Sequence, residues 1–343
     1  MKPVFLSVDR SLKFWRSDAP YYNGEVQTSP LECVSMDGCA RSIRDIEAYP
    51  SVLDGSEEPV EVLVPSKAYC SKTSLLATRV IEFPLPPYSF CRASGNVYVC
   101  APTLLFLLAA SRYSLHELIA VGLELCGTYS PRDGMPSKSD HDAICDVQTL
   151  RDYVASITGN VRGIQLARRA LQYIEDGSAS PRETDAYMMY CLPSHLGGFG
   201  LDGVGLNSPV DTKKHARAIT KLPYITPDLF WEKSGIALEY ESDEWHSIYA
   251  SGYVPEAMAR FVNKTKLMSD SERRRTFEAM KITSITLTNG EFVDFDEAER
   301  IARLLTRRMG KRYNSSRRVW VKRTKLHGWL KVPVLERDPG FAL

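Results

Sequence analysis

Two short segments rich in aromatic and β-branched residues constrain the fold of this chain most strongly. Residues 224–231 and 236–241 have the composition of β-strands, and the polar or small residues 232–235 lie between them. Two such runs separated by so short a connection are typical of a β-hairpin. The sequence therefore predicts an antiparallel strand pair in this region.

The register of this hairpin follows from its turn. If residues 233–234 form a two-residue turn, Trp231 pairs with Ile236, and Asp228 lies directly opposite Glu239. Opposed side chains in an antiparallel pair have Cβ atoms roughly 4.5–5.5 Å apart. Two carboxylates at that separation repel each other, and a divalent cation relieves the repulsion. The pair is therefore a candidate metal site, and a surface hairpin with alternating polar residues is the alternative.

The hairpin has a readable set of elements around it. We expect, in chain order, a helix over 181–191, a strand near 206–210, the two hairpin strands, a helix over 255–280, a strand over 282–287 and a helix over 295–309. This order is α-β-β-β-α-β, followed by a further helix. It predicts an α/β fold in which a mixed sheet is flanked by helices.

The first half of the chain predicts an α+β domain with many turns. Strands are expected over 60–64, 79–83 and 96–99, and helices over 102–108, 115–125, 147–157 and 161–174. Ser114 has the position of an N-cap for the helix over 115–125. Residues 130–142 are polar and contain proline and glycine, which is typical of a linker. We therefore divide the chain into an N-terminal domain (1–130), a linker with helices (131–179), a domain containing the hairpin (180–310) and a basic C-terminal tail (311–343).

Charge is distributed unevenly along the 343 residues, although the net charge is only +1. Residues 260–332 contain 19 Lys and Arg against 8 Asp and Glu, so the rest of the chain is acidic. A basic region of this kind is typical of contact with nucleic acid. The alternative is a solvated helical surface. The tail, with Trp320 and Trp329, predicts either contact with nucleic acid or a strand pair that packs its tryptophans inward.

The cysteines and the apolar segments indicate the compartment. Eight cysteines occur without a CxxC motif, and most lie in apolar runs, which is typical of buried thiols in a reducing environment. The first residues lack the apolar segment of a signal peptide, and the run 97–110 is interrupted and too short to span a bilayer. We therefore expect a cytoplasmic protein.

The acidic motifs resemble those of a known superfamily. A helix with Glu183, then Pro227-Asp228, then Glu239-x-Glu241, then Trp245-His246 is similar to the PD-(D/E)XK restriction-endonuclease-like superfamily, in a branch near the very-short-patch repair endonucleases. The stretch from Asp270 to Arg275 resembles the D-x-x-R helix of that branch. The resemblance covers residues 180–310 and implies a restriction-endonuclease-like core.

The resemblance implies a hydrolase that cleaves DNA phosphodiester bonds with Mg²⁺ or Mn²⁺. It assigns metal binding to Asp228, Glu239 and Glu183, and adds Glu241 and His246 as catalytic residues. Glu241 stands where most active members have a lysine, and the resemblance leaves Lys264 or Lys266 to replace it. It also assigns DNA contacts to Arg273, Arg274, Lys264 and Lys266.

Several of these residues also have structural interpretations. Ser180-Pro181-Arg182-Glu183 fits a helix capping box, in which Glu183 serves the helix and not a metal. His246 is either a metal ligand, a general base or a buried histidine bonded to a neighbour. A run of arginines such as 273–275 is often a solvated helix face.

The N-terminal half resembles, through Val97-Tyr98-Val99-Cys100-Ala101-Pro102 and Leu115-His116-Glu117-Leu118, the helical region of AbiEi-type regulators. This resemblance implies a bacterial defence or toxin–antitoxin setting, with an antitoxin or regulator protein as a partner. Two functions follow from the whole sequence: a metal-dependent DNA endonuclease, or a catalytically inactive module of the same fold that binds nucleic acid or a partner protein.

Overall fold

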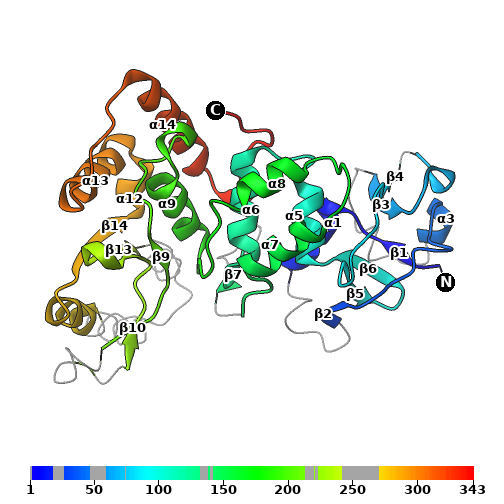
Figure 1. Ribbon diagram of the computed structural model, residues 1–343, viewed down its shortest axis with the longest axis horizontal. Coiled ribbons are helices and arrows are strands. Elements are labelled where there is room, and N and C mark those ends of the chain that lie inside the picture. The colour runs from blue at the N-terminus through cyan, green and yellow to red at the C-terminus, as the bar shows by residue number, and fades with distance from the viewer. Residues whose placement is uncertain are drawn as a thin grey trace, which may run out of the picture.

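The computed structural model describes residues 2–17, 27–46, 59–73, 75–131, 138–139, 142–212, 220, 223–241 and 270–343. The described elements form an elongated molecule, with the N-terminal sheets at one end and the C-terminal sheet at the other (Figure 1). Helices of the middle of the chain lie between the two ends.

The first half of the chain contains two small sheets and a group of helices. A four-stranded sheet has the order β1-β6-β5-β2, and a parallel pair joins β3 to β4. The elements are β1 (Val4–Phe5), α1 (Val8–Arg16), β2 (Gln27–Leu31), α3 (Ile43–Ile46), β3 (Val60–Val64), β4 (Leu76–Val80), β5 (Phe90–Ser94), β6 (Val97–Cys100), α5 (Pro102–Ala109), α6 (Leu115–Leu125), β7 (Tyr129–Ser130), β8 (Lys138–Ser139), α7 (Val147–Ser156) and α8 (Ile164–Ala170).

The apolar run near residue 100 forms the core of this half. All residues of β6 and α5 are buried, and Pro102 opens α5 at a position where a missing backbone N–H costs nothing. The Trp15 indole of α1 donates to the Cys100 carbonyl oxygen at 2.9 Å. Among the described residues, no helix has the length and the apolar character that a bilayer span requires.

Helices α7 and α8 lie against the preceding helices. The Ser114 side chain caps α6 in a capping box with Glu117, as the sequence predicts for the start of this helix. Helix α7 packs on α5, and α8 packs on α6. The helices of the predicted linker region thus contact the N-terminal helices, while the domain boundaries themselves stay predictions.

The second half of the chain contains a mixed four-stranded sheet in the order β14-β13-β12-β9. Strands β9, β12 and β13 are antiparallel neighbours, and β14 is parallel to β13. The elements are α9 (Pro181–Cys191), β9 (Gly205–Leu206), β10 (Val210–Asp211), β11 (Tyr224–Ile225), β12 (Leu229–Trp231), β13 (Ile236–Glu241), β14 (Thr283–Thr288), α12 (Asn289–Val293), α13 (Phe295–Arg308) and α14 (Arg317–Leu330).

Each face of this sheet is covered by a helix. Phe230 and Ala237 pack with Phe277, which belongs to the helical residues 270–279. Leu229 and Leu238, on the other face, join the large core that includes α9. The protein is therefore of the α/β class, with a mixed sheet between helices as the sequence predicts.

Several sequence predictions are wrong in detail. The strand expected near 206–210 is divided into β9 and β10, and the strand expected over 224–231 is divided into β11 and β12; β9 pairs with β12, whereas β10 pairs with β11 in a separate sheet. Of the helix expected over 255–280, residues 255–269 lie outside the described residues. The strand expected over 79–83 is β4, Leu76–Val80, because it pairs residue by residue with β3 and ends where β3 ends. The helix expected over 161–174 is the shorter α8, which begins after Gly163 in a left-handed conformation with φ of 90°.

The C-terminal region is neither an extended tail nor a strand pair. It contains the helix α14, which packs on α9. Arg323 of α14 is only 1% exposed, and its guanidinium donates to the Asn314 carbonyl oxygen at 2.6 Å and lies 4.5 Å from the Phe199 ring centroid. Trp329 is buried, whereas Trp320 remains 48% exposed. The helical period, which buries one side and exposes the other, explains this difference.

Candidate active site

The hairpin has the register that the sequence predicts. Trp231 pairs with Ile236 in the β12–β13 ladder, and its continuation sets Asp228 opposite Glu239. The connection between the two strands is longer than the expected two-residue turn. Residues 232–234 form a short 3₁₀ helix, which ends at Gly235 with φ of 60°. Gly235 accommodates this left-handed conformation without the strain that a Cβ would add.

The carboxylates of Asp228 and Glu239 each accept a backbone N–H from the opposite strand of the hairpin. The Asp228 backbone N–H donates to Glu239 Oε1 at 3.3 Å, and the Tyr240 backbone N–H donates to Asp228 Oδ2 at 2.6 Å. Asp228 Oδ1 accepts no hydrogen bond from the described residues. These contacts orient both carboxylates at the edge of the hairpin where Asp228 precedes β12 and Glu239 lies in the second half of β13.

Glu183 reaches the same place from α9. The Ser180 side chain caps this helix by accepting from the Glu183 backbone N–H, and the Ser180 hydroxyl donates to Glu183 Oε1 at 2.9 Å. Glu183 Oε2 accepts from the Ala179 backbone N–H at 3.0 Å and from the Asn207 amide at 2.6 Å. The carboxylate therefore serves the helix start, but through the Ala179 N–H and the Ser180 hydroxyl in place of the Ser180 backbone N–H that a capping box uses. It also lies close enough to Asp228 to raise the pKa of that carboxyl.

Asn207 connects α9 to the hairpin, and the sequence analysis did not identify it. Its backbone N–H donates to the Asp228 carbonyl oxygen at 3.0 Å, while its amide holds Glu183. Asn207 has a φ of 44°, a left-handed conformation that asparagine tolerates better than most residues. An asparagine directly after a short strand was the available signal for this role.

The three carboxylates influence one another's protonation. The pKa of Asp228 lies well above its ordinary value, because the group is buried and because the charges of Glu183 and Glu239 disfavour a further negative charge. The Tyr240 N–H and Arg273 offset part of this rise. The pKa of Glu183 is also raised, mainly by burial. The cluster is thus an electrostatically unfavourable arrangement that a bound cation would relieve.

Arg273 supplies a cation to this cluster. Its Nε donates to Glu239 Oε2 at 2.6 Å, and its Nη2 donates to the Thr226 carbonyl oxygen at 2.7 Å. The guanidinium lies 5.2 Å from the Phe277 ring centroid. The spacing of Arg273 and Phe277, four residues apart on one helix, places both on the side that meets the sheet. Arg273, expected to contact DNA, is therefore occupied by a carboxylate in this structure.

The remaining predicted site residues lie at the edge of this cluster or outside the described residues. Glu241 follows Glu239 by two residues on β13, so it shares a face with Glu239 and is exposed. Arg274 is exposed on the helical residues 270–279. His246, Lys264 and Lys266 fall outside the part of the chain that the structure describes.

The donor set suits Mg²⁺ or Mn²⁺ in chemical type, because both ions prefer oxygen ligands and take carboxylates readily. Asp228 Oδ1 is available, and Glu239 Oε1 accepts only the long 3.3 Å bond from the Asp228 backbone. Among the described residues, however, no three His, Cys, Asp or Glu side chains form a ready-made metal site. Metal binding would therefore need small side-chain rearrangements.

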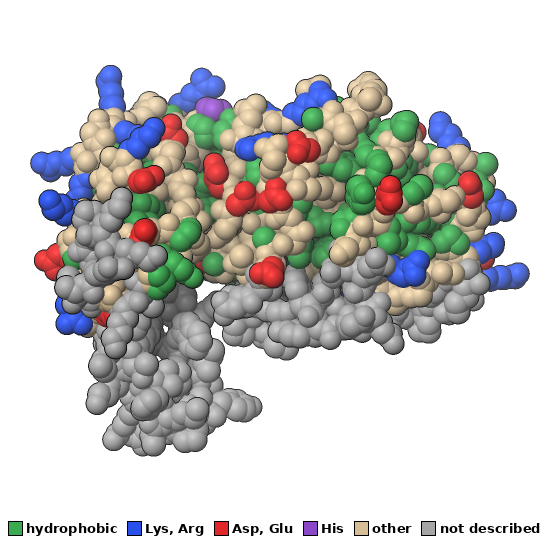
Figure 2. All heavy atoms as spheres, turned by 60° about the horizontal axis from the view of Figure 1, so that its bottom comes forward, with side chains coloured by type: hydrophobic (Ala, Val, Ile, Leu, Met, Phe, Trp, Pro, Cys, Tyr) green, Lys and Arg blue, Asp and Glu red, His purple; other side chains and the backbone are tan. Residues whose placement is uncertain are grey.

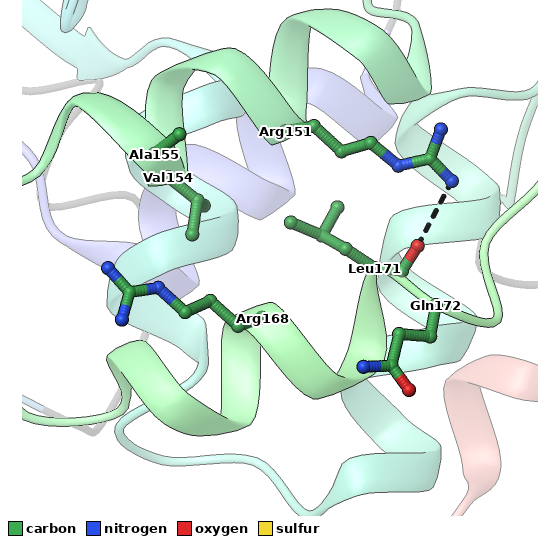
Figure 3. Close-up of a pocket in the computed structure, with 6 residues that line it drawn as sticks. All are labelled: Arg151, Val154, Ala155, Arg168, Leu171 and Gln172. Carbon is green, nitrogen blue, oxygen red and sulfur yellow. Dashed lines mark hydrogen bonds between the residues drawn. The ribbon is translucent and has the colours of Figure 1, made fainter.

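A separate hollow of about 320 Å³ lies between α7 and α8. Figure 3 shows Arg151 on one helix and Arg168 on the other, at opposite sides of an apolar floor. Arg151 donates to the Leu171 carbonyl oxygen at 3.2 Å. The hollow is lined by Arg151, Val154, Ala155, Arg168, Leu171 and Gln172, which include no nucleophile and no carboxylate.

Comparisons with known proteins give no further guidance. No family model, curated protein or solved structure matches this chain.

Proposed function

We propose that the protein is a metal-dependent nuclease that hydrolyses DNA phosphodiester bonds at Asp228, Glu239 and Glu183. The observation that carries this proposal is the opposed pair Asp228 and Glu239, whose backbone contacts fix two carboxylates side by side. A restriction-endonuclease-like core agrees with the mixed sheet between helices, and this finer fold assignment belongs to the same proposal.

The charge balance of the cluster supports a cation-binding role. Three carboxylates lie close enough for Glu183 and Glu239 to raise the pKa of Asp228, and Arg273 alone among the named contacts brings a positive charge. An enzyme that uses a divalent ion needs such an excess of negative charge, which the free protein tolerates at a cost in stability.

Each residue of the cluster would have a distinct role. Asp228 and Glu239 would hold Mg²⁺, and Glu183 would act as a further carboxylate fixed by Asn207 and the α9 cap. When bound, the ion supplies Lewis-acid polarisation of the phosphodiester and a water of lowered pKa. Arg273 lies next to Glu239, and its guanidinium would neutralise a phosphate oxygen after releasing the Glu239 carboxylate. The proton-transfer role predicted for His246 or a lysine falls on residues outside the described part.

A second candidate function is a catalytically inactive module that binds nucleic acid or a partner protein, such as an antitoxin. Glu241 favours this candidate, because it occupies the position where a lysine would assist the attacking water. The ion pair between Arg273 and Glu239 also favours it, since it satisfies one carboxylate without metal.

The decisive experiment is a cleavage assay on plasmid, single-stranded DNA and RNA with Mg²⁺ or Mn²⁺. We expect the wild-type protein to cleave DNA and Asp228→Asn to lose at least a hundredfold in rate, since a metal ligand is removed. Glu232→Gln is the matched control, because Glu232 is an exposed carboxylate on the same hairpin. Equal activity of the wild type and Asp228→Asn would refute the proposal.

Thermal denaturation separates the two candidates when no cleavage occurs. A ligand that binds only the folded state stabilises it, by about 2.7 kcal/mol at a concentration of 100 times its Kd. We expect Mg²⁺ or Mn²⁺ to raise the Tm of the wild type and of Glu232→Gln but not that of Asp228→Asn. Absence of a metal-dependent shift in all three proteins, together with absence of cleavage, would favour the inactive module.

A further inference from the structure

The densest run of positive charge in the chain lies on α13, α14 and the loop between them. Residues 301–325 contain ten Lys and Arg and no Asp or Glu. In Figure 2, Lys and Arg side chains project at both ends of the molecule, including the end that the C-terminal half forms in Figure 1. This concentration of one sign of charge requires an explanation.

Four of the ten cations have partners within the protein. Arg303 pairs with Glu299, and Lys311 pairs with Asp202. Lys322 donates to the His195 carbonyl oxygen at 2.8 Å, and Arg323 is buried. Buried Arg323 is closed to a ligand, whereas the other three would have to exchange a partner within the protein for a ligand.

The other six cations are exposed, and none forms an ion pair with a described residue. We call this set the cationic surface; it consists of Arg307, Arg308, Arg312, Arg317, Arg318 and Lys325. Six unpaired charges of one sign on neighbouring segments repel one another in the free protein. A polyanion would remove this repulsion.

The cationic surface is held by a rigid support. Buried Arg323 donates to the Asn314 carbonyl oxygen at 2.6 Å, and its guanidinium lies 4.8 Å from the Tyr313 ring centroid. Trp320 of α14 contacts Phe295 of α13 edge to face, with ring centroids 6.2 Å apart. The loop and both helices therefore keep fixed positions, which lowers the entropic cost of binding.

The first residues of α14 carry positive charges, which destabilise a helix N-terminus. Arg317 and Arg318 are its first two residues, and its N-cap Ser316 makes no side-chain hydrogen bond to the helix. Cations near a helix N-terminus are unfavourable, because the helix dipole is positive there. Phosphate groups at this position would interact favourably with both the arginines and the dipole.

The chemistry of the surface favours nucleic acid over a lipid membrane. Five of the six residues are arginines, whose planar guanidinium matches phosphate oxygens in two-point contacts. From Arg317 to Lys325, α14 extends about 12 Å, which spans three or four phosphates of one strand along a duplex axis. A membrane-bound helix needs a broad exposed apolar face, whereas α14 exposes two adjacent large apolar side chains, Trp320 and Val321, and buries Leu326, Trp329 and Leu330.

We propose that the cationic surface binds the phosphate backbone of double-stranded DNA, independently of base sequence. Arg312, Arg317 and Arg318 provide the central contacts, and exposed Trp320 lies on the same helix. This inference deepens the proposed nuclease function by naming where its substrate docks. It does not depend on hydrolysis, because binding and cleavage use different residues.

The test measures binding of a short fluorescent DNA duplex by anisotropy over a range of NaCl concentrations, without divalent ions. We expect the wild type to bind with a steep salt dependence. In the triple variant Arg312→Gln, Arg317→Gln, Arg318→Gln, affinity at low salt should fall at least tenfold. Its slope of log K against log salt should become shallower by roughly 2–3, since each neutralised phosphate contributes about 0.9.

The matched control is Arg162→Gln, Arg168→Gln, Arg169→Gln, which removes three exposed arginines at or near α8 and so changes the net charge equally. We expect this control to bind like the wild type. Equal weakening of both triple variants, or duplex binding without salt dependence, would overturn the proposal. The proposal would also be overturned if the wild type bound anionic phospholipid vesicles but no duplex, and if the cationic-surface triple variant lost the vesicle binding.

Two further measurements distinguish this inference from the nuclease proposal. Asp228→Asn should retain duplex binding even where it abolishes cleavage. The cationic-surface triple variant should have a Tm equal to or slightly above that of the wild type and keep its shift with Mg²⁺, because the three arginines are exposed and two of them lie at the helix N-terminus.

Discussion

At the scale of single residues, the carboxylate cluster depends on one internal cation. Arg273 neutralises Glu239 directly and lowers the pKa of Asp228, which burial and the two neighbouring carboxylates raise. The guanidinium thus offsets part of the repulsion among the carboxylates, which would otherwise destabilise the hairpin.

Arg273→Gln is expected to destabilise the protein by roughly 1–3 kcal/mol at pH 7, the cost of losing hydrogen bonds that involve a charged group. The loss should be smaller at pH 4. A carboxyl whose pKa is raised on folding contributes stability that is fully present below its unfolded pKa, about 3.9 for Asp, and is lost as the pH rises through the folded value. Removing Arg273 raises the pKa of Asp228 further and so enlarges this loss.

Urea denaturation at the two pH values measures the effect. Arg274→Gln is the control, since Arg274 is the exposed neighbour on the same helix and should change stability by less than about 0.5 kcal/mol. A destabilisation by Arg273→Gln that is independent of pH would show that the arginine acts through packing on Phe277 alone.

At the scale of the helices, close packing in the middle of the molecule depends on a residue without a side chain. Gly122 lies in α6, and a Cβ added there would lie 2.2 Å from Ile174 Cδ1 and 3.1 Å from Phe106 Cε2. Ile174 and Phe106 are fully buried, so neither side chain has free space beside it. This glycine sets how closely α5 and the segment after α8 approach α6.

Gly122→Ala should therefore destabilise the protein by about 1–3 kcal/mol, because overpacking outweighs the gain of up to about 1 kcal/mol in helix propensity. The double variant Gly122→Ala, Ile174→Val should recover part of the loss, since it removes Cδ1 at 2.2 Å while the contact with Cγ1 at 2.9 Å remains. The midpoint and slope of urea denaturation measure both effects.

Gly328→Ala provides the control for helix propensity. Gly328 lies within α14, and an added Cβ would meet no atom within 4 Å. We expect this substitution to stabilise the protein by roughly 0.5–1 kcal/mol. If Gly122→Ala were equally stabilising, the described approach of Ile174 to α6 would be wrong.

At the scale of the whole molecule, the last residues of the chain connect the two halves. Arg337 pairs with Asp185 of α9 at 2.6 Å, and both side chains are almost fully buried. Farther on, the Gly340 backbone N–H donates to Glu117 of α6 at 2.6 Å, and Phe341 contacts His116 edge to face. The C-terminal segment therefore crosses from the half that contains the carboxylate cluster to the N-terminal helices.

Arg337→Met is expected to cost about 3 kcal/mol, because it leaves Asp185 buried with Arg182 as its remaining cationic partner. Calorimetry and urea denaturation measure the loss. The double variant Asp185→Asn, Arg337→Met should regain a substantial part, since no uncompensated charge then remains. If the destabilisation of the double variant equalled the sum of the destabilisations of Asp185→Asn and Arg337→Met, the two side chains would not be coupled.

The sequence alone determined the features that local rules encode. The aromatic and β-branched composition of two short segments around a polar connection indicated the hairpin, and pairing Trp231 with Ile236 set Asp228 opposite Glu239. Ser114 and Ser180 identified two helix starts, because a helix cap involves residues only three positions apart. The mixed α/β class followed from the order of these elements. The sequence did not determine the shape of the turn at Gly235 or the bounds of β4.

Only the tertiary structure decided which residues complete the cluster and which basic residues remain free. Arg273 meets Glu239 across 34 residues of chain, and Asn207 meets Glu183 across 24, because the sheet lies between helices from distant segments. The same packing buries Arg323 while its neighbours on α14 stay exposed. Local periodicity predicts which face of an element is apolar, but the partner of that face depends on long-range contacts between elements that no short pattern records.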